Sequence, residues 1–222
     1  MINILKQCEI GEASCALHIF STNKQVIEHN VVQLARTCPD FVEIKAQDFV
    51  NCRTTGKLKV MNGHHSRVQK TCLDALLALG IGVRVMLIKN VDVADGLVNG
   101  VCRTVTHIIY PSDPGNFPET VYVKFDDITI GAEIRKRCTY PEAIAMASTG
   151  IRAEEERVTT KGGLRRQFPL KLAWACTVHK VQGLTVDTAV VCLKRIFAAG
   201  QAYVALSRVR SLSGLVIQDF EE

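Results

Sequence analysis

The sequence predicts an α/β protein in which a mainly β segment interrupts the α/β pattern. Near the N-terminus, the apolar stretch 16–20 precedes polar residues that begin helices, and apolar residues at helical spacing follow. The middle of the chain has short apolar stretches separated by tight turns, and strands and helices alternate again from Phe168. A strand followed by a capped helix is the unit of an α/β sheet. We therefore expect the two ends of the chain to share one domain, with the middle inserted into it.

The first strand and helix have clear limits. Residues 16–20 (ALHIF) predict a buried strand, and Ser21, Thr22 and Asn23 are all good N-cap residues. The helix is expected to continue to about Arg36.

The middle of the chain predicts a small β-barrel. Two turn signals, Asp95-Gly96 and Asn99-Gly100, lie among short strands. The expected strands cover 83–88, 101–109, 120–125 and, less regularly, 128–134. Residues 141–163 are expected to form a mobile connection.

The C-terminal part predicts a second run of α/β elements. Strands are expected at 170–176, 188–193 and 215–217, with a turn and short helix at 178–182 and a helix at 199–208. Tyr203 and Leu206 fall three apart on that helix, so both are expected to pack against the core.

The composition is that of a folded protein, and the positive charge is concentrated in one segment. The chain has 27 Lys and Arg against 22 Asp and Glu, a net charge of +5, and 47% hydrophobic residues. Residues 161–210 carry a net +8 with Asp187 as their single acid, and the rest of the chain is −3. Such a segment suits a polyanion such as nucleic acid or a nucleotide phosphate, and a solvated basic face accounts for it equally well.

Composition also limits the class of protein. The longest uncharged apolar stretch runs from Ala75 to Val83, shorter than the ~20 residues of a helical membrane span. The nine cysteines are scattered without a CxxC pair, which favours free thiols over a disulfide framework, and no metal site is expected.

The segment 174–185 (WACTVHKVQGLT) is the first candidate for chemistry. An apolar strand ends at Cys176, Thr177 is placed to cap the following turn, and His179, Lys180 and Gln182 crowd one short loop. Ligands of α/β sheets bind near the carboxyl ends of strands, where a cation can neutralise phosphate. A polar surface turn explains this segment nearly as well.

The segment 200–211 (GQAYVALSRVRS) is the second. Arg208 and Arg210 lie at the end of the predicted helix, a position from which a rigidly held arginine can stabilise a transferred phosphoryl group. On these residues alone, an arginine that simply complements the helix C-terminus is the simpler explanation.

Together these segments resemble a known family. Residues 167–185 and 197–220 look like the last two motifs of the Pif-type (petite integration frequency) DNA helicases, in the RecD-like branch of superfamily one. Residues 79–100 are similar to the segment that leads into the family's inserted barrel. Residues 17–30 are similar to the opening strand and helix of the family's second RecA-like domain. The resemblance implies a RecA-like second helicase domain interrupted by a small inserted β-barrel. It divides the chain into 1–79 (first part of the RecA-like domain), 80–166 (barrel and connection) and 167–222 (the remainder).

The resemblance also implies roles for individual residues. Arg208 matches the catalytic arginine that reaches the γ-phosphate of ATP across the domain interface. Gln182 and Gly183 match the loop that faces the nucleotide. The positions that match the path of single-stranded DNA are Thr177, His179, Lys180 and, with weaker support, Thr22 and Asn23.

The chain departs from the family at two points. The common serine of the HKxQG loop is Val181, which is expected to weaken a DNA or loop contact. No GxxxxGK[ST] phosphate loop and no recognisable Walker B carboxylate occur in the sequence. ATP and Mg²⁺ are therefore expected only in a complete enzyme, with the N-terminal RecA-like domain as the missing partner, and this chain alone is expected to be inactive.

The leading hypothesis is the C-terminal half of an ATP-dependent helicase that moves five-prime to three-prime and acts on single-stranded DNA and duplex junctions. The alternatives are a non-catalytic nucleic-acid-binding remnant of a helicase or mobile element, and an unrelated α/β protein. No membrane partner is expected. The family and the free thiols favour an intracellular, nuclear setting, with mitochondria as the alternative.

Overall fold

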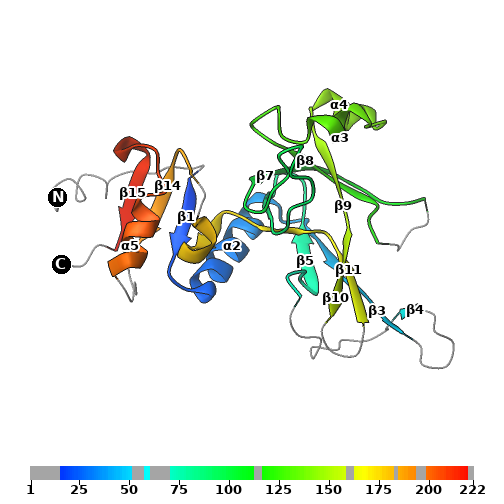
Figure 1. Cartoon of the computed structure of the whole chain (residues 1–222), viewed down its shortest axis with the longest axis horizontal. Coiled ribbons are helices and arrows are strands. Elements are labelled where there is room, and N and C mark those ends of the chain that lie inside the picture. The colour runs from blue at the N-terminus through cyan, green and yellow to red at the C-terminus, as the bar shows by residue number, and fades with distance from the viewer. Residues whose placement is uncertain are drawn as a thin grey trace. The chain divides into compact units, whose positions relative to one another are not determined.

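A computed structural model of the chain describes residues 16–51, 58–60, 71–112, 117–158, 163–182, 185–193 and 199–219. The chain forms two compact units, one made of Met1–Arg36 and Ala173–Glu222 and the other of Thr37–Leu172 (Figure 1). The first unit is thus assembled from both ends of the sequence. This arrangement agrees with the prediction that the middle of the chain interrupts an α/β domain.

The first unit is built on a parallel sheet. Its four strands lie in the order β13 (Ala175–Thr177), β1 (Leu17–Phe20), β14 (Ala189–Cys192) and β15 (Leu215–Gln218). All three strand pairs are parallel. The strands alternate with α2 (Asn23–Thr37), α5 (Ala199–Leu206) and two short 3₁₀-helices, η1 (Val178–Val181) and η2 (Leu212–Gly214).

The core of this sheet follows from its apolar strands. Leu17 and Ile19 of β1 are at most 1% exposed, and all four residues of β14 are buried. A central parallel strand is covered on both faces, which explains why β14 reads as a continuous apolar stretch.

Helix α2 begins where the sequence predicts. The Thr22 hydroxyl donates to Oε1 of Gln25 (2.7 Å) and accepts a long hydrogen bond from the Gln25 backbone N–H (3.4 Å). Thr22 thus caps the helix through its hydroxyl, which also binds the Gln25 side chain. Further along α2, buried Asn30 binds the backbone of Ala175, accepting from its N–H (2.8 Å) and donating to its carbonyl (3.1 Å). Asn30 thereby satisfies backbone groups at the outer side of strand β13.

Within its described residues, the second unit contains three antiparallel sheets. β2 (Val42–Lys45) pairs with β5 (Leu76–Leu79). A four-stranded sheet has the order β10 (Glu154–Val158), β11 (Gly163–Gln167), β3 (Gln47–Asn51), β4 (Leu58–Val60). A five-stranded sheet has the order β12 (Leu170–Leu172), β6 (Arg84–Leu87), β7 (Cys102–Ile109), β8 (Thr120–Lys124), β9 (Thr149–Arg152). Within the described ranges none of these sheets closes on itself, so the structure supports a mixed α/β fold and not, by itself, a closed barrel.

Buried polar groups hold the second unit together. Arg165 is 6% exposed, and its guanidinium binds both carboxylate oxygens of Asp48, at 2.7 and 2.8 Å. Gln167 is fully buried and donates to the carbonyl of Ile44 (3.0 Å). These bonds join β11 to β3 and β2, so Arg165, although part of the basic segment 161–210, is committed to an internal ion pair.

Two sequence predictions in this unit are wrong. Residues 128–134 do not form a strand: a turn leads into helix α3 (Ala132–Lys136), whose Glu133 and Ile134 N–H groups donate to the Asp95 carboxylate at 2.9 and 3.1 Å. Residues 141–163 are not simply a mobile connection, since they include α4 (Pro141–Ala145), β9 and β10. Residues 159–162 lie outside the described residues.

The predicted strand 170–176 is two strands, and they belong to different units. β12 pairs with β6 in the second unit, and β13 pairs with β1 in the first. The second unit runs from Thr37 to Leu172 and so is wider than the predicted insertion 80–166. The difference arises because β2, β3 and β5 pair with strands within that unit.

Of the helices in the described residues, none is long and apolar enough to cross a membrane.

Candidate nucleotide and nucleic-acid site

The predicted DNA-facing residues follow two neighbouring strands of the parallel sheet. β1 and β13 run in parallel, and their last residues, Phe20 and Thr177, are paired. Thr22 and Asn23 follow β1, while His179 and Lys180 follow β13. All four therefore leave the sheet at its carboxyl edge, where α/β proteins bind ligands.

Helix η1 separates solvent-facing residues from core residues. In a 3₁₀-helix, residues three apart lie on the same side. Val178 and Val181 are 3% and 0% exposed, whereas His179 and Lys180 between them are exposed. The sequence VHKV therefore anchors the turn by its valines and presents the imidazole and ammonium groups to solvent.

Two expectations about this loop are corrected by the structure. Thr177 stands at the N-cap of η1, but its side chain makes no capping hydrogen bond and is 8% exposed. Val181 is fully buried, so its side chain lies beneath the loop and does not itself face solvent.

Thr22 and Asn23 differ in what they offer. The Thr22 hydroxyl is engaged with the backbone N–H and the side chain of Gln25, whereas Asn23, the first residue of α2, is exposed. The arrangement leaves the Asn23 side chain accessible at the carboxyl edge.

Arg208 lies at the opposite edge of the same sheet. Val186, shortly before β14, forms an isolated parallel bridge with Val209, which precedes η2 and β15. The Val186 N–H donates to the Arg208 carbonyl (2.9 Å), and the Arg210 N–H donates to the Val186 carbonyl (3.1 Å). Because Val186 precedes the first residue of β14, the bonded Arg208 is at the amino edge of the sheet. Gln182 is exposed in the segment that joins the two edges, and Gly183 lies outside the described residues.

The Arg208 side chain is held against the end of α5. Its Nε donates to the Val204 carbonyl (3.1 Å) and its Nη2 to the Ser207 hydroxyl (2.9 Å). Neighbouring Arg210 instead pairs with Asp187, at 3.3 Å. No carboxylate in the described part of the chain lies within ion-pair distance of Arg208. Its positive charge is thus positioned by neutral groups and left available to an anion.

The prediction that Tyr203 packs against the core is wrong. Tyr203 is 74% exposed and Leu206 is half-buried, whereas Ala205 is buried among the described side chains of α5. Helical spacing identifies residues that share a face and does not say which face is covered.

Within the described residues, no three His, Cys, Asp or Glu side chains are grouped to hold a metal ion.

The comparisons agree with this architecture. A family model for the 2B domain of DNA helicase Pif1 matches residues 67–108. The chain is 42% identical over 152 residues to the ATP-dependent DNA helicase PIF1 of Danio rerio, a match covering 67% of this chain and 20% of that protein. The crystal structure of Pif1 helicase from Candida albicans superposes with a TM-score of 0.70 at 26% identity, covering 99% of this chain and 49% of that one.

A third relative adds bound ligands. Pif1 helicase from Bacteroides, solved with ADP-AlF3 and single-stranded DNA, shares the fold with a TM-score of 0.65 at 24% identity, covering 100% of this chain and 45% of that one. The chain thus spans about half of the solved helicases and a fifth of the curated relative.

The parallel sheet and these matches define the C-terminal region of a helicase-type α/β protein. Over the matched residues the chain is similar to the Pif1 family of DNA helicases.

Proposed function

We propose that this chain is the C-terminal part of an ATP-dependent DNA helicase, with the first unit as its second RecA-like domain. The second unit would be the inserted domain, whose short antiparallel strands correspond to the expected small barrel. The proposal is supported by the discontinuous first unit and by the match of residues 67–108 to a 2B domain.

One observation carries the proposal. The residues proposed to face DNA and the arginine proposed to face ATP lie at opposite edges of one short parallel sheet, linked by residues 182–186. The backbone of Val186 is hydrogen-bonded to the backbones of Arg208 and Arg210. A movement of Arg208 toward a phosphate would therefore move Val186, and through the chain would displace Gln182 and η1. The geometry suits a coupling of nucleotide state to grip on DNA.

Arg208 is proposed to stabilise charge on the γ-phosphate. Bound ATP with Mg²⁺ would supply the phosphoryl group and its bridging cation, held largely by the other RecA-like domain. This chain would contribute a guanidinium fixed by Val204 and Ser207, with Gln182 beside the nucleotide.

His179 and Lys180 are proposed to contact the phosphates of single-stranded DNA. Both are exposed on η1, and Asn23 lies at the same edge of the sheet. Thr177 is too buried to offer its side chain without a local change, so a contact there would use the backbone. Duplex junctions as substrates, and a nuclear setting, belong to the same proposal by family resemblance.

Binding of a labelled oligothymidine to the purified chain tests the DNA-facing edge. Lys180→Ala should weaken binding about two- to tenfold at low salt and reduce the slope of log affinity against log salt by about one. Lys45→Ala removes another exposed charge, from the second unit, and serves as the matched control. Equal affinities of wild type and Lys180→Ala, or an affinity unaffected by salt, would contradict the proposed contact.

A further inference from the structure

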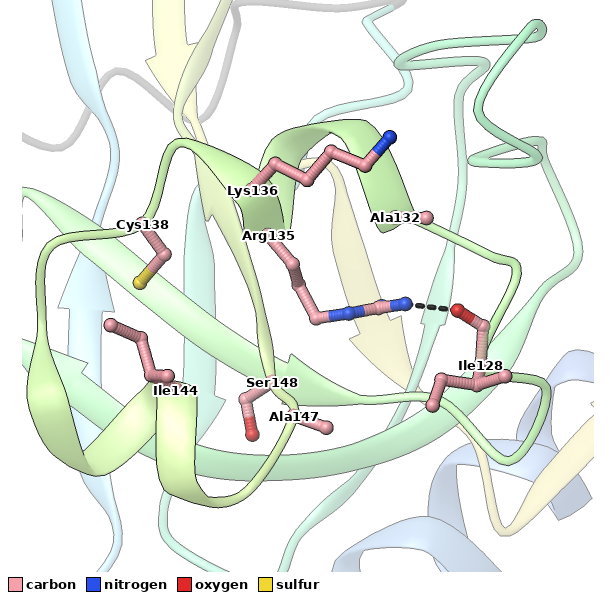
Figure 2. A pocket seen from close by; sticks show the side chains of 8 residues that line it. All are labelled: Ile128, Ala132, Arg135, Lys136, Cys138, Ile144, Ala147 and Ser148. Carbon is pink, nitrogen blue, oxygen red and sulfur yellow. Dashed lines mark hydrogen bonds between the residues drawn. The ribbon is translucent and has the colours of Figure 1, made fainter.

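The second unit contains a pocket that the proposed motor function does not use. Its volume is about 350 Å³, and its walls come from the turn after β8, from α3, and from α4 with the turn that follows it (Figure 2). The size suits one or two inserted side chains and lies at the lower end of the range for ligand pockets.

Large apolar side chains stand at this pocket without cover. Ile128 is 71% exposed and Ile144 is 56% exposed, and Figure 2 shows them on opposite sides with Ala147 and Ser148 between them. Met146, just beyond α4, is also 42% exposed. Exposed apolar side chains gathered around a concave site are typical of a surface that binds a partner.

The walls are fixed by hydrogen bonds within the unit. The Arg135 guanidinium donates to the carbonyls of Ile128 and Ile130 and to the Thr149 hydroxyl, the last two at 2.6 and 2.8 Å. The Ser148 hydroxyl, at the base of the turn, accepts from Thr106 Oγ1 (2.9 Å). A pocket held open in this way binds without a large ordering cost.

The charge at the pocket is positive. Arg135 and Lys136 line it, and no carboxylate does. The hydrogen bonds of Arg135 all go to neutral oxygens, so its charge is not cancelled locally. Lys136 pairs with Glu133 at the surface, where both side chains are more than half exposed and such a pair is weak.

We propose that this pocket docks a short segment of a partner protein in which a large aliphatic side chain is flanked by Asp or Glu. The aliphatic group would enter between Ile128 and Ile144, and the acidic neighbours would meet Arg135 and Lys136. Nucleic acid suits the pocket less well, because no aromatic side chain lines it to stack a base. The proposal does not depend on the helicase function.

Selection from random short peptides displayed on phage tests this proposal. The immobilised full chain selects binders, and the Ile144→Glu variant, which places a carboxylate at the mouth of the pocket, is the negative selector. Ile81→Glu is the matched control, because Ile81 is 66% exposed and does not line the pocket. We expect peptides that combine Leu, Ile or Met with Asp or Glu to be enriched on wild type and Ile81→Glu alone.

Anisotropy of a labelled enriched peptide then gives the size of the effect. Ile144→Glu and Lys136→Glu should each weaken the affinity for the peptide about tenfold or more, while the midpoint of thermal unfolding stays unchanged. Absence of Ile144-dependent enrichment, or enrichment of basic peptides, would overturn the proposal. The proposal would also be overturned if oligothymidine displaced the peptide and if Ile144→Glu abolished the binding of oligothymidine itself. The pocket would then be a nucleic-acid site.

Discussion

Val181 shows how a single residue can be misjudged from a motif. Within the HKxQG loop it stands where the family commonly has serine, yet its side chain is fully buried beside Val178. Burial follows from the 3₁₀ spacing of the two valines, which is visible in the sequence once η1 is recognised as 3₁₀. The position therefore supports the loop from below.

Val181→Ser should destabilise the first unit by about 1–3 kcal/mol, because it removes buried methyl groups and buries a hydroxyl. Urea unfolding followed by the fluorescence of Trp174, three residues before the end of β13, measures this change. Lys180→Ser in the same helix is exposed and should change stability by less than about 0.5 kcal/mol. If Val181→Ser unfolds at the wild-type midpoint, the valine is not part of the core.

Arg208 carries the catalytic prediction. In an enzyme assembled by joining this chain to a helicase half that carries a phosphate loop, Arg208→Ala should lower ATP turnover about a thousandfold while ATP still binds. Steady-state hydrolysis and binding of a fluorescent ATP analogue separate the two effects. Arg210→Ala is the control, since Arg210 is paired with Asp187 and should retain most of the turnover. Loss of ATP binding in Arg208→Ala would point to a structural role.

Elements with strong local signals were predicted well. The apolar stretches that became β1, β7 and β14 and the capped start of α2 needed no knowledge of the fold, because apolar strand patterns and N-cap residues are local features. Helix α3 could not be predicted in that way. Its N-terminal N–H groups are satisfied by Asp95, which lies 38 residues from Glu133 along the chain. The local sequence pattern around 128–134 favours a strand, but the distant Asp95 carboxylate stabilises a helix by accepting its first N–H groups.

Asp95→Asn should therefore destabilise the second unit by about 1–3 kcal/mol. Both carboxylate oxygens accept backbone N–H groups, and an amide retains a single acceptor oxygen. Chemical denaturation gives the free energy, and hydrogen exchange should be faster at the Glu133 and Ile134 amides. Asp126→Asn is the matched control, because its side chain is 83% exposed. Unchanged exchange at both amides would show that Asp95 does not cap α3.

At the scale of the whole molecule, charge counted along the chain is a poor guide to surface charge. The segment 161–210 crosses from the second unit into the first, and several of its cations are already paired. Arg165 binds Asp48, Lys171 binds Asp74 and Arg210 binds Asp187. Lys180 and Arg208 are the residues that we propose as phosphate partners. The fold separates them to opposite edges of one sheet, which no count along the sequence could show.

The division into two units makes a prediction about folding. In the second unit each described strand pairs within residues 37–172, and its ion pairs Arg165–Asp48 and Lys89–Glu154 are also internal. The excised segment 37–172 should therefore fold alone, with dispersed amide NMR signals and a cooperative urea transition. A segment ending at residue 158 is the control. It lacks β11, which lies between β10 and β3, and β12, which pairs with β6, so it leaves both larger sheets incomplete. It should remain unfolded. A folded 37–158, or an unfolded 37–172, would mean that the contacts joining these sheets do not decide the stability of the unit.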